Sequence, residues 1–409
     1  MKKKYIAFLC SSNDLNLVLG PHEHLFKKLS KNFDKFYLIN FINFKLFSDP
    51  SGIKGKFNNE LKKNINKPEN LEIHTPKSIN EFKNFMTDKQ IIGIQNLSRN
   101  LSDMLTHYVI AKFKIKQIMI SNFGFFNSEF KSSLYDKISK PLANFFYYLN
   151  KPFGQKIILI LTIFKIFEKI EIRFTSDKEM LERINKNIFK KILYKLNFFY
   201  SKEIILINSK NFDYFDEKTF KENQNKIVLL DTFLDHPDGL AVIKKISDEN
   251  KNKYYKSLKC FLDKLSNYYN KQITVCIHPK DNLKDKEKIF NNNEVKQYET
   301  TKNIYEAFLV LYFDTSAVVD AILLKKKILF ISSKYIPEST FDMGKTYADK
   351  SGILHLGIED SLENIISSLD NKLEKQTQKY DSYINNFIKI SGNKKGLDVV
   401  IDTIKERFF

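Results

Sequence analysis

The chain of 409 residues is poor in the residues that build disulfide frameworks, metal sites and membrane spans. Its three cysteines, Cys10, Cys260 and Cys276, stand at unrelated spacings, so neither a disulfide framework nor a cysteine zinc site is expected. The longest apolar run, 157–164, is far shorter than the ~20 residues that a spanning helix needs. The basic start leads into too short an apolar stretch for a signal peptide. We therefore expect a cytoplasmic protein that is soluble or peripheral on the inner face of the membrane.

Several motifs of common enzyme classes are also missing. The chain has no G-x-G-x-x-G and no G-x-x-x-x-G-K-[ST] loop, so a dinucleotide dehydrogenase or a P-loop NTPase has no support. It has no Asp-x-Asp pair, and His22-Glu23-His24 is too tight to place both rings on one helix face. We expect a reaction that needs no metal and no cofactor.

The formal charge of +19, from 67 basic and 48 acidic residues, would ordinarily indicate nucleic acid, an anionic membrane or an anionic substrate. Only four of the basic residues are arginine, the residue that reads bases and clamps phosphates with two hydrogen bonds. Abundant Lys, Asn, Phe and Ile match the output of an AT-rich genome. We interpret the charge as mostly compositional, keep an anionic membrane surface as a candidate partner, and expect no nucleic acid.

Short apolar runs alternate with longer helical patterns, which is typical of α/β architecture with parallel strands. Two groups of strands flank a helical block at 135–196, so we predict two doubly wound Rossmann-like domains that face a cleft. The predicted boundaries are 1–200 and 201–380, with a helix at 381–409 that packs back on the first domain. Strands are predicted at 4–10, 36–42, 91–94, 117–121 and 172–175 in the first group, and at 204–207, 226–230, 272–278, 310–313 and 327–332 in the second.

The strip from Lys137 to Lys169 combines lysines with aromatic and aliphatic residues, and it has two interpretations. A basic amphipathic helix of this kind can lie in a membrane interface. The alternative, which we favour, is a buried crossover helix at the domain junction, because apolar residues at helical spacing most often form core.

One strand of the second half stops on His278-Pro279-Lys280. In open α/β sheets, ligands bind outside the carboxyl ends of the strands, where this turn is predicted to lie. A histidine at a strand end is often only a structural hydrogen-bonding residue. The neighbouring lysine and the motif described next favour a role in binding an anion.

That second motif is Asp314-Thr315-Ser316, which follows another apolar strand and opens a helix predicted at 316–324. Free backbone N–H groups and the helix dipole both favour an anion at such a start. Together the two strand ends predict a cradle for a phosphate group.

A third strand end carries Asp231 and, a few residues later, Asp235, His236 and Asp238. These carboxylates can bond a sugar or ribose hydroxyl, and the imidazole can meet a phosphate. An ordinary Pro-Asp-Gly turn explains the same residues equally well.

In the first half, Asp14, His22 and Glu23 follow the first strand and are the candidates for a base that deprotonates an acceptor hydroxyl. The ends of other first-half strands are candidates to line the acceptor side: Ser98, Asn122 and Gly124.

The succession of motifs over 226–333 resembles bacterial surface-polysaccharide glycosyltransferases of the GT-B fold. It is more distantly similar to bacterial sialyltransferases and Kdo transferases, which share a His-Pro motif and a Ser/Thr-Ser motif and use CMP-activated acidic sugars. The resemblance implies that His278 bonds the donor phosphate and that Thr315 and Ser316 hold it. The acidic pair followed by glycine that supplies the base in sialyltransferases has no match here, so the base stays unassigned.

From these observations we expect a glycosyltransferase that moves a nonulosonic acid or Kdo from a CMP donor to a glycan, glycolipid or protein acceptor. CDP, UDP and GDP donors use comparable helix-start sites, so the nucleotide stays open. The alternatives are a phosphotransferase of the CDP-glycerol type and a non-catalytic assembly or membrane-surface protein with the same fold.

Overall fold

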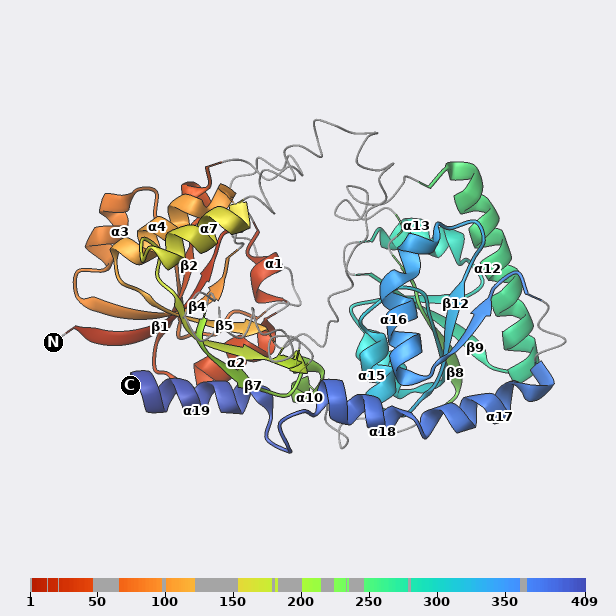
Figure 1. Ribbon diagram of the computed structural model, residues 1–409. Helices are drawn as coiled ribbons and strands as arrows, with labels where there is room; N and C mark the ends of the chain where they lie inside the picture. The colour runs from red at the N-terminus through yellow and green to blue at the C-terminus, as the bar shows by residue number, and fades with distance from the viewer. Residues whose placement is uncertain are drawn as a thin grey trace. The chain divides into compact units, whose positions relative to one another are not determined.

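The computed structural model describes residues 2–12, 14–20, 22–46, 66–97, 101–121, 154–178, 181–182, 201–214, 224–232, 234, 246–278, 281–360 and 366–409. These residues form two compact domains (Figure 1). The first contains the described residues up to Asp213 together with Ile390–Phe409, and the second contains those within Tyr214–Lys389. The prediction of two α/β Rossmann-like domains is confirmed.

The first domain is built on a seven-stranded parallel sheet in the order β3-β2-β1-β4-β5-β6-β7. The strands are β1 Lys3–Cys10, β2 Phe36–Asn40, β3 Leu71–His74, β4 Lys89–Asn96, β5 Lys116–Ser121, β6 Ile170–Thr175 and β7 Ser201–Leu206. Its helices include α1 Asn16–Leu19, α2 Glu23–Asn32, η1 Ile42–Phe44, α3 Ile79–Phe85, η2 Leu101–Asp103, α4 Met104–Lys112, α7 Gly154–Ile163, α10 Lys210–Tyr214 and α19 Gly396–Phe408. The direction of winding reverses between β1 and β4.

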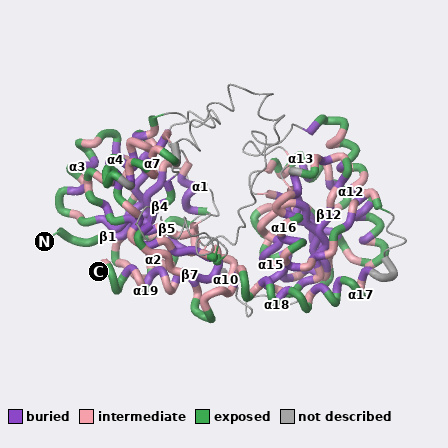
Figure 2. Tube along the Cα trace, viewed as in Figure 1, coloured by how far each residue is buried: buried purple, intermediate pink, exposed green. Residues whose placement is uncertain are grey.

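Both faces of this sheet are covered, as the buried strands in Figure 2 show. Successive side chains of a strand point to opposite faces. Ile6 and Phe8 therefore pack with α2 and α19, whereas Ala7 and Leu9 pack with α3 and α4. Double burial explains why these strands read in the sequence as continuous apolar runs.

The C-terminal helix α19 belongs to the first domain, where it packs on α2 and forms an ion pair between Asp398 and Lys28. Asp213 caps its start, because its carboxylate accepts the N–H groups of Gly396 at 2.5 Å and Leu397 at 3.0 Å. A Cβ atom on Gly396 would meet the carbonyl oxygen of Asn208 at 2.6 Å, so this close approach requires glycine.

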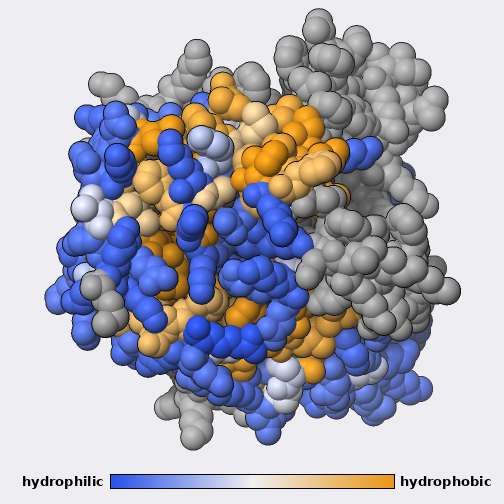
Figure 3. Space-filling model, turned by 60° about the vertical axis from the view of Figure 1, so that its left-hand side comes forward, coloured by the Kyte–Doolittle hydropathy of each residue, from blue (hydrophilic) through white to orange (hydrophobic). Residues whose placement is uncertain are grey.

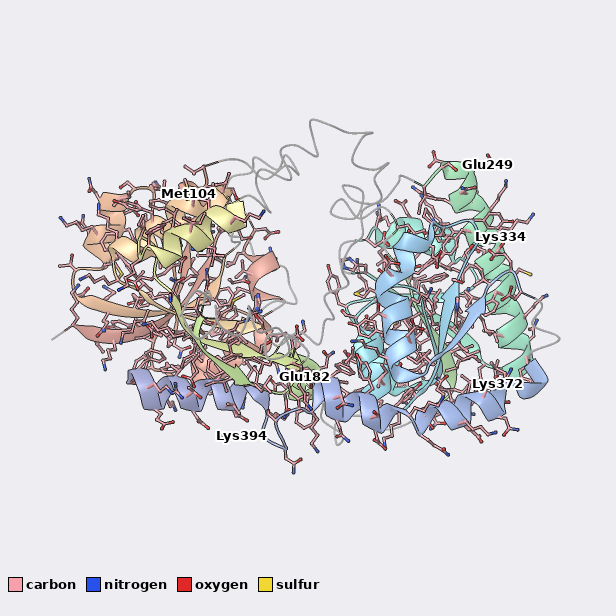
Figure 4. All side chains as sticks on the ribbon, in the orientation of Figure 1. Met104, Glu182, Glu249, Lys334, Lys372 and Lys394 are labelled. Carbon is pink, nitrogen blue, oxygen red and sulfur yellow. The ribbon has the colours of Figure 1, made fainter. Side chains whose placement is uncertain are left out.

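Asn208 holds the segment just before α19. Its side-chain amide donates to the carbonyl oxygens of Gly392 and Lys394, both at 2.8 Å, and its oxygen accepts the N–H of Ser391 at 2.9 Å. Lys394, labelled in Figure 4, lies on this segment. The end of β7 is thus bonded to the chain that enters α19.

The second domain is built on a six-stranded parallel sheet in the order β10-β9-β8-β11-β12-β13, which reverses direction between β8 and β11. The strands are β8 Lys226–Leu230, β9 Gln272–Ile277, β10 Glu294–Gln297, β11 Ala307–Tyr312, β12 Lys327–Ser332 and β13 Leu354–Gly357. Its helices include α12 Asp248–Tyr269, α13 Leu283–Ile289, α14 Thr300–Tyr305, α15 Val318–Leu323, η4 Glu338–Phe341, α16 Asp342–Ser351, α17 Ile366–Thr377, α18 Tyr380–Tyr383 and the π-helix Ile384–Ile388.

Several predicted elements differ from those observed. The strand predicted at 204–207 was grouped with the second half, but β7 pairs with β6 in the first sheet, so that grouping was wrong. Three four-residue strands, β3, β10 and β13, were missed, because short strands at sheet edges carry little apolar pattern. The helix predicted from Ser316 begins at Val318. Of the helical block predicted at 135–196, residues 135–153 and most of 179–196 lie outside the described residues.

No helix within the described ranges is long and apolar enough to cross a bilayer.

Candidate functional site

Three neighbouring strands of the second domain, β9, β8 and β11, end at the same edge of the sheet. Adjacent strands are about 4.8 Å apart, so the ends of β9 and β11 lie roughly 10 Å from each other with the end of β8 between them. The N–H of Asp314, after β11, donates to Thr232 Oγ1, after β8, at 3.2 Å. The sheet therefore brings His278 and the Asp314-Thr315-Ser316 segment to one edge, on either side of Thr232.

His278 directly follows β9 and is half-buried. Its carbonyl oxygen accepts the N–H of Asp281 at 2.9 Å and the side-chain amide of Gln297 at 3.3 Å. These two bonds fix the backbone of His278 at the edge of the sheet, so the position of its imidazole depends on few remaining torsions.

The carboxylate of Asp314 is bonded within the domain. It accepts the N–H of Gly344, in the first turn of α16, at 2.7 Å. Burial raises the pKa of Asp314 to about 6, against the opposing effect of the N–H of Gly344. Asp314 thus anchors α16 at the predicted cradle.

The two hydroxyl residues of the cradle are half-buried in the turn that precedes α15. Thr315 Oγ1 accepts the N–H of Ala317 at 3.3 Å, and the carbonyl oxygen of Ser316 accepts the N–H of Val319 at 3.2 Å. These bonds order the turn and leave both hydroxyl protons as donors for a bound anion.

Beside the same edge lies a buried ionic cluster of Asp231, Asp281, Tyr255 and Lys286. Lys286 Nζ is 2.5 Å from Asp231 Oδ2, 2.9 Å from Tyr255 OH and 3.3 Å from Asp281 Oδ2. The side chains of Lys286 and Asp231 are 6% and 1% exposed. The cluster joins the ends of β8 and β9 to α13.

The charges in this cluster depend on each other. Burial by itself would lower the pKa of Lys286, but the carboxylate of Asp231 and the hydroxyl of Tyr255 outweigh burial and raise it. Burial also raises the pKa of Tyr255 to about 12. The protonated lysine therefore neutralises carboxylates that could not otherwise stay buried. Asp231 was a candidate for bonding a sugar hydroxyl, and the structure pairs its carboxylate with Lys286 instead.

Lys286 was missed because 280–300 reads in the sequence as a polar surface segment. The available signal was Asp231 itself, since a carboxylate directly after a fully buried strand needs a cation close by.

A pocket of about 860 Å³ opens between α12 and α13. Five lysines and three aspartates line it, including Lys286 and Asp281 of the ionic cluster, so its surface is net positive. Leu234 and Asp281 connect it to the ends of β8 and β9, whereas His278, Thr315 and Ser316 are not among its lining residues. The volume lies within the range of small-molecule sites. It is a neighbour of the predicted cradle rather than the cradle itself.

In the described part of the chain, no group of three His, Cys, Asp or Glu side chains is placed to hold a metal ion.

The first-domain candidates lie near the end of β1. Asp14 Oδ1 accepts both the backbone N–H and the side-chain amide of Asn16, the first residue of α1, at 2.9 Å. Glu23 pairs on the surface with Lys27 at 2.8 Å. The ring of His22 contacts that of Phe8 with centroids 4.9 Å apart. Burial, with a smaller effect of Lys210, lowers the pKa of His22 to about 4, so its imidazole is neutral at pH 7 and is a weaker base than a solvent-exposed histidine.

The shifted pKa of His22 predicts how stability changes with pH. Its folded-state pKa of about 4 lies below the unfolded value of ~6.5, so the unfolded chain binds more protons between them. This residue therefore weakens folding as the pH falls through that window, by about 3 kcal/mol in full. Asp213 and Asp314, whose folded-state pKa values are raised to about 6, act in the opposite direction.

Between pH 7 and pH 4.5 the free energy of unfolding of the parent should fall because of His22. In the His22→Asn variant we expect this fall to be about 2–3 kcal/mol smaller. Urea unfolding at both pH values measures this difference. An identical pH dependence of the two proteins would show that the imidazole is not buried in the folded state.

The remaining predicted site residues lie outside the described residues: Pro279, Lys280, Asp235, His236, Asp238, Ser98, Asn122 and Gly124.

No protein-family model matches the chain, and no curated protein matches its sequence. The fold, however, is similar to solved structures over nearly the whole chain. The calicheamicin glycosyltransferase CalG4 is 8% identical, with a TM-score of 0.50 and 100% of both chains covered. UGT89C1 of Arabidopsis thaliana in complex with UDP-L-rhamnose is 12% identical, with a TM-score of 0.50, covering 98% of this chain and 99% of that one.

A variant of the wall teichoic acid polymerase TagF is also 12% identical, with a TM-score of 0.52, covering 98% of this chain and 88% of that chain. At such low identity the similarity concerns the fold alone. The two parallel-sheet domains and these structures together show that the chain adopts the GT-B fold, as predicted.

Proposed function

We propose that the protein is a glycosyltransferase that takes a sugar from a nucleotide donor bound at the carboxyl edge of the second-domain sheet. The observation that carries the proposal is the arrival of His278, Thr315 and Ser316 at one sheet edge, across the point where the strand order reverses. Crevices at such reversal points are where open α/β sheets bind their ligands.

The chemistry of transfer explains the need for these residues. As the bond between the sugar and the phosphate oxygen of the nucleotide breaks, negative charge grows on the leaving phosphate. The imidazole of His278 and the hydroxyls of Thr315 and Ser316 are hydrogen-bond donors that can stabilise this charge. Donors that the fold already holds in place require little reorganisation during the reaction, which is the main advantage of preorganised sites. The proposal assigns no metal to this step.

The donor that we favour is a CMP-linked nonulosonic acid or Kdo, on the basis of the sequence resemblance. The acceptor is a surface glycan, a glycolipid or a protein, bound by the first domain. Asp14, His22 and Glu23 of that domain are the candidates for the base that accepts the proton of the acceptor hydroxyl. Asp14 and Glu23 are bonded to Asn16 and Lys27, and the lowered pKa of His22 makes its imidazole a weak base. The proposal places the reaction in the cytoplasm, at the inner face of the membrane.

A thermal-shift panel of CMP, CDP, UDP and GDP tests the donor. A ligand at 100 times its Kd that binds only the folded protein stabilises it by about 2.7 kcal/mol, so the melting temperature rises by several degrees. We expect CMP to give the largest shift. A shift with UDP alone would keep the glycosyltransferase and replace the donor, and no shift with any of the four would overturn the proposal.

The second candidate is a phosphotransferase of the CDP-glycerol type, which the similarity to the wall teichoic acid polymerase favours. Product analysis separates the two reactions. Glycosyl transfer forms a glycoside, whereas transfer from CDP-glycerol forms a phosphodiester and releases CMP.

A further inference from the structure

Helix α7 and the turn after it expose an apolar stripe. Ile158 and Thr162 face inward and are buried, whereas Lys156, Ile160 and Phe164, spaced four residues apart, lie on the opposite side of the helix. Phe164 is 72% exposed and Ile160 is 50% exposed. Exposing several large apolar side chains on one side of a helix is unfavourable in water. Such a stripe is typical of a surface that binds a partner.

The end of the helix extends the stripe. Lys165 has a positive φ of 60°, and the N–H groups of Lys165 and Ile166 donate back to the carbonyl oxygens of Thr162 and Leu161. This is the Schellman arrangement that ends a helix. Beyond it, Ile166 is 51% exposed, while Phe167 turns inward against the ring of His107 on α4.

Neighbouring elements also expose large apolar side chains. Helix α4 lies beside α7 (Figure 1), and it exposes Tyr108, with the ammonium of Lys112 5.9 Å from its ring. Leu46 is exposed where its N–H bonds to Ser102 of η2, on which α7 packs. Figure 3 shows hydrophobic residues gathered on this domain among hydrophilic ones. We call Ile160, Phe164 and Ile166, together with Lys156 and Lys165, the apolar–basic surface.

The charge of this surface selects its partner. The stretches 104–116 and 154–167 contain five lysines and no aspartate or glutamate. The nearest acidic residues in sequence are Asp103, which is buried, and Glu168, which follows the turn. Aromatic and aliphatic side chains surrounded by lysines match the boundary between acyl chains and anionic headgroups. A protein partner would have to present an apolar centre surrounded by acidic residues. An anionic lipid leaflet presents acyl chains and negative headgroups together.

We propose that the apolar–basic surface docks the first domain on an anionic lipid bilayer, with Phe164, Ile160 and Ile166 inserted at the headgroup level. Lys156 and Lys165 contact the lipid phosphates. This docking would place the proposed sugar transfer at a membrane surface, and only that role for docking rests on the proposed function. The surface itself is argued from side chains remote from the predicted phosphate cradle in sequence and in domain.

Vesicle flotation without any nucleotide sugar tests the docking. Vesicles of phosphatidylcholine with about 30% phosphatidylserine are compared with pure phosphatidylcholine, at 0.1 M and 0.5 M salt. Each lysine near an anionic surface contributes a factor of about five to partitioning. We expect binding to the anionic vesicles to exceed that to the neutral ones at least tenfold and to fall steeply at high salt.

Two double variants separate the apolar from the charged contribution. Phe164→Glu with Ile166→Glu, and Lys156→Glu with Lys165→Glu, should each lower partitioning at least tenfold. Tyr268→Glu, on α12 of the second domain and exposed to a similar extent, is the matched control and should bind like the parent. Melting temperatures near that of the parent show that the variants are folded.

Parent protein that stays unbound at 0.1 M salt, or double variants that bind as well as the parent, would overturn the proposal. A parent that is dimeric in solution and becomes monomeric in the Phe164→Glu, Ile166→Glu variant would also overturn it, because a second copy would then cover the surface. Since no donor is present, failure of docking leaves sugar transfer untouched, and failure of transfer leaves docking untouched.

Discussion

Replacing His278 by alanine is expected to lower the turnover number about 10²–10³-fold, because removal of one preorganised donor to a developing anion typically has this effect. The alanine variant keeps the bonds that join this residue to Asp281 and Gln297, since both use its backbone carbonyl. Steady-state kinetics with the donor that the thermal-shift panel identifies measures the effect. His278→Gln, which keeps a side-chain N–H donor, should retain more activity than the alanine variant.

The matched control is His355→Ala. His355 is at the other side of the same sheet, on edge strand β13, where its ring bonds to Ser332 at 2.7 Å. We expect its loss to leave turnover within about twofold of the parent. If His278→Ala kept full turnover with every donor that the parent accepts, His278 would have no role in the mechanism. Thr315 and Ser316 would then be the only proposed donors to the phosphate.

The largest effect on stability is expected from Lys286→Met. The ammonium of Lys286 lies between the carboxylates of Asp231 and Asp281 in the domain interior. Its removal leaves two buried carboxylates without a cation, and breaking a buried ion pair by removing one partner typically costs about 3–5 kcal/mol. Urea unfolding at pH 7 should show a loss of this size in the free energy of unfolding.

Lys288→Met is the control for this measurement. Lys288 is on the same helix but is 81% exposed, and its nearest carboxylate, that of Asp285, is 3.9 Å away. Exposed pairs of this kind contribute little, so a change below about 0.5 kcal/mol is expected. If Lys286→Met lost no more stability than Lys288→Met, the cluster would have to be solvated.

The strands that could be predicted from the sequence are those buried along most of their length. Strands such as β1, β8 and β11 are covered on both faces, and that burial produces the apolar runs from which they were recognised. Edge strand β10 reads Glu-Val-Lys-Gln and is nearly indistinguishable from a loop. The assignment of β7 to a sheet could not be predicted either, because partner choice is set by tertiary packing and not by the pattern within the strand.

For the candidate site, strand-end positions could be predicted and the partners of the side chains could not. Parallel strands deliver their carboxyl ends to one edge, so His278 and Ser316 were expected together. The pairing of Asp231 with Lys286 joins residues 55 positions apart through a helix whose register the polar sequence does not reveal. The use of the Asp314 carboxylate to hold α16 depends likewise on a contact across 30 residues.

The placement of α19 has a consequence for how the molecule is made. Leu397, Val400, Ile401 and Ile404 complete the same core as Ile6 and Phe8, so this domain combines segments that are translated before and after the second domain. During synthesis the ribosome must finish the entire second domain before these residues emerge. Until α19 emerges, one face of the first-domain sheet stays partly uncovered. The second domain, although translated later, is therefore the first that can fold to completion.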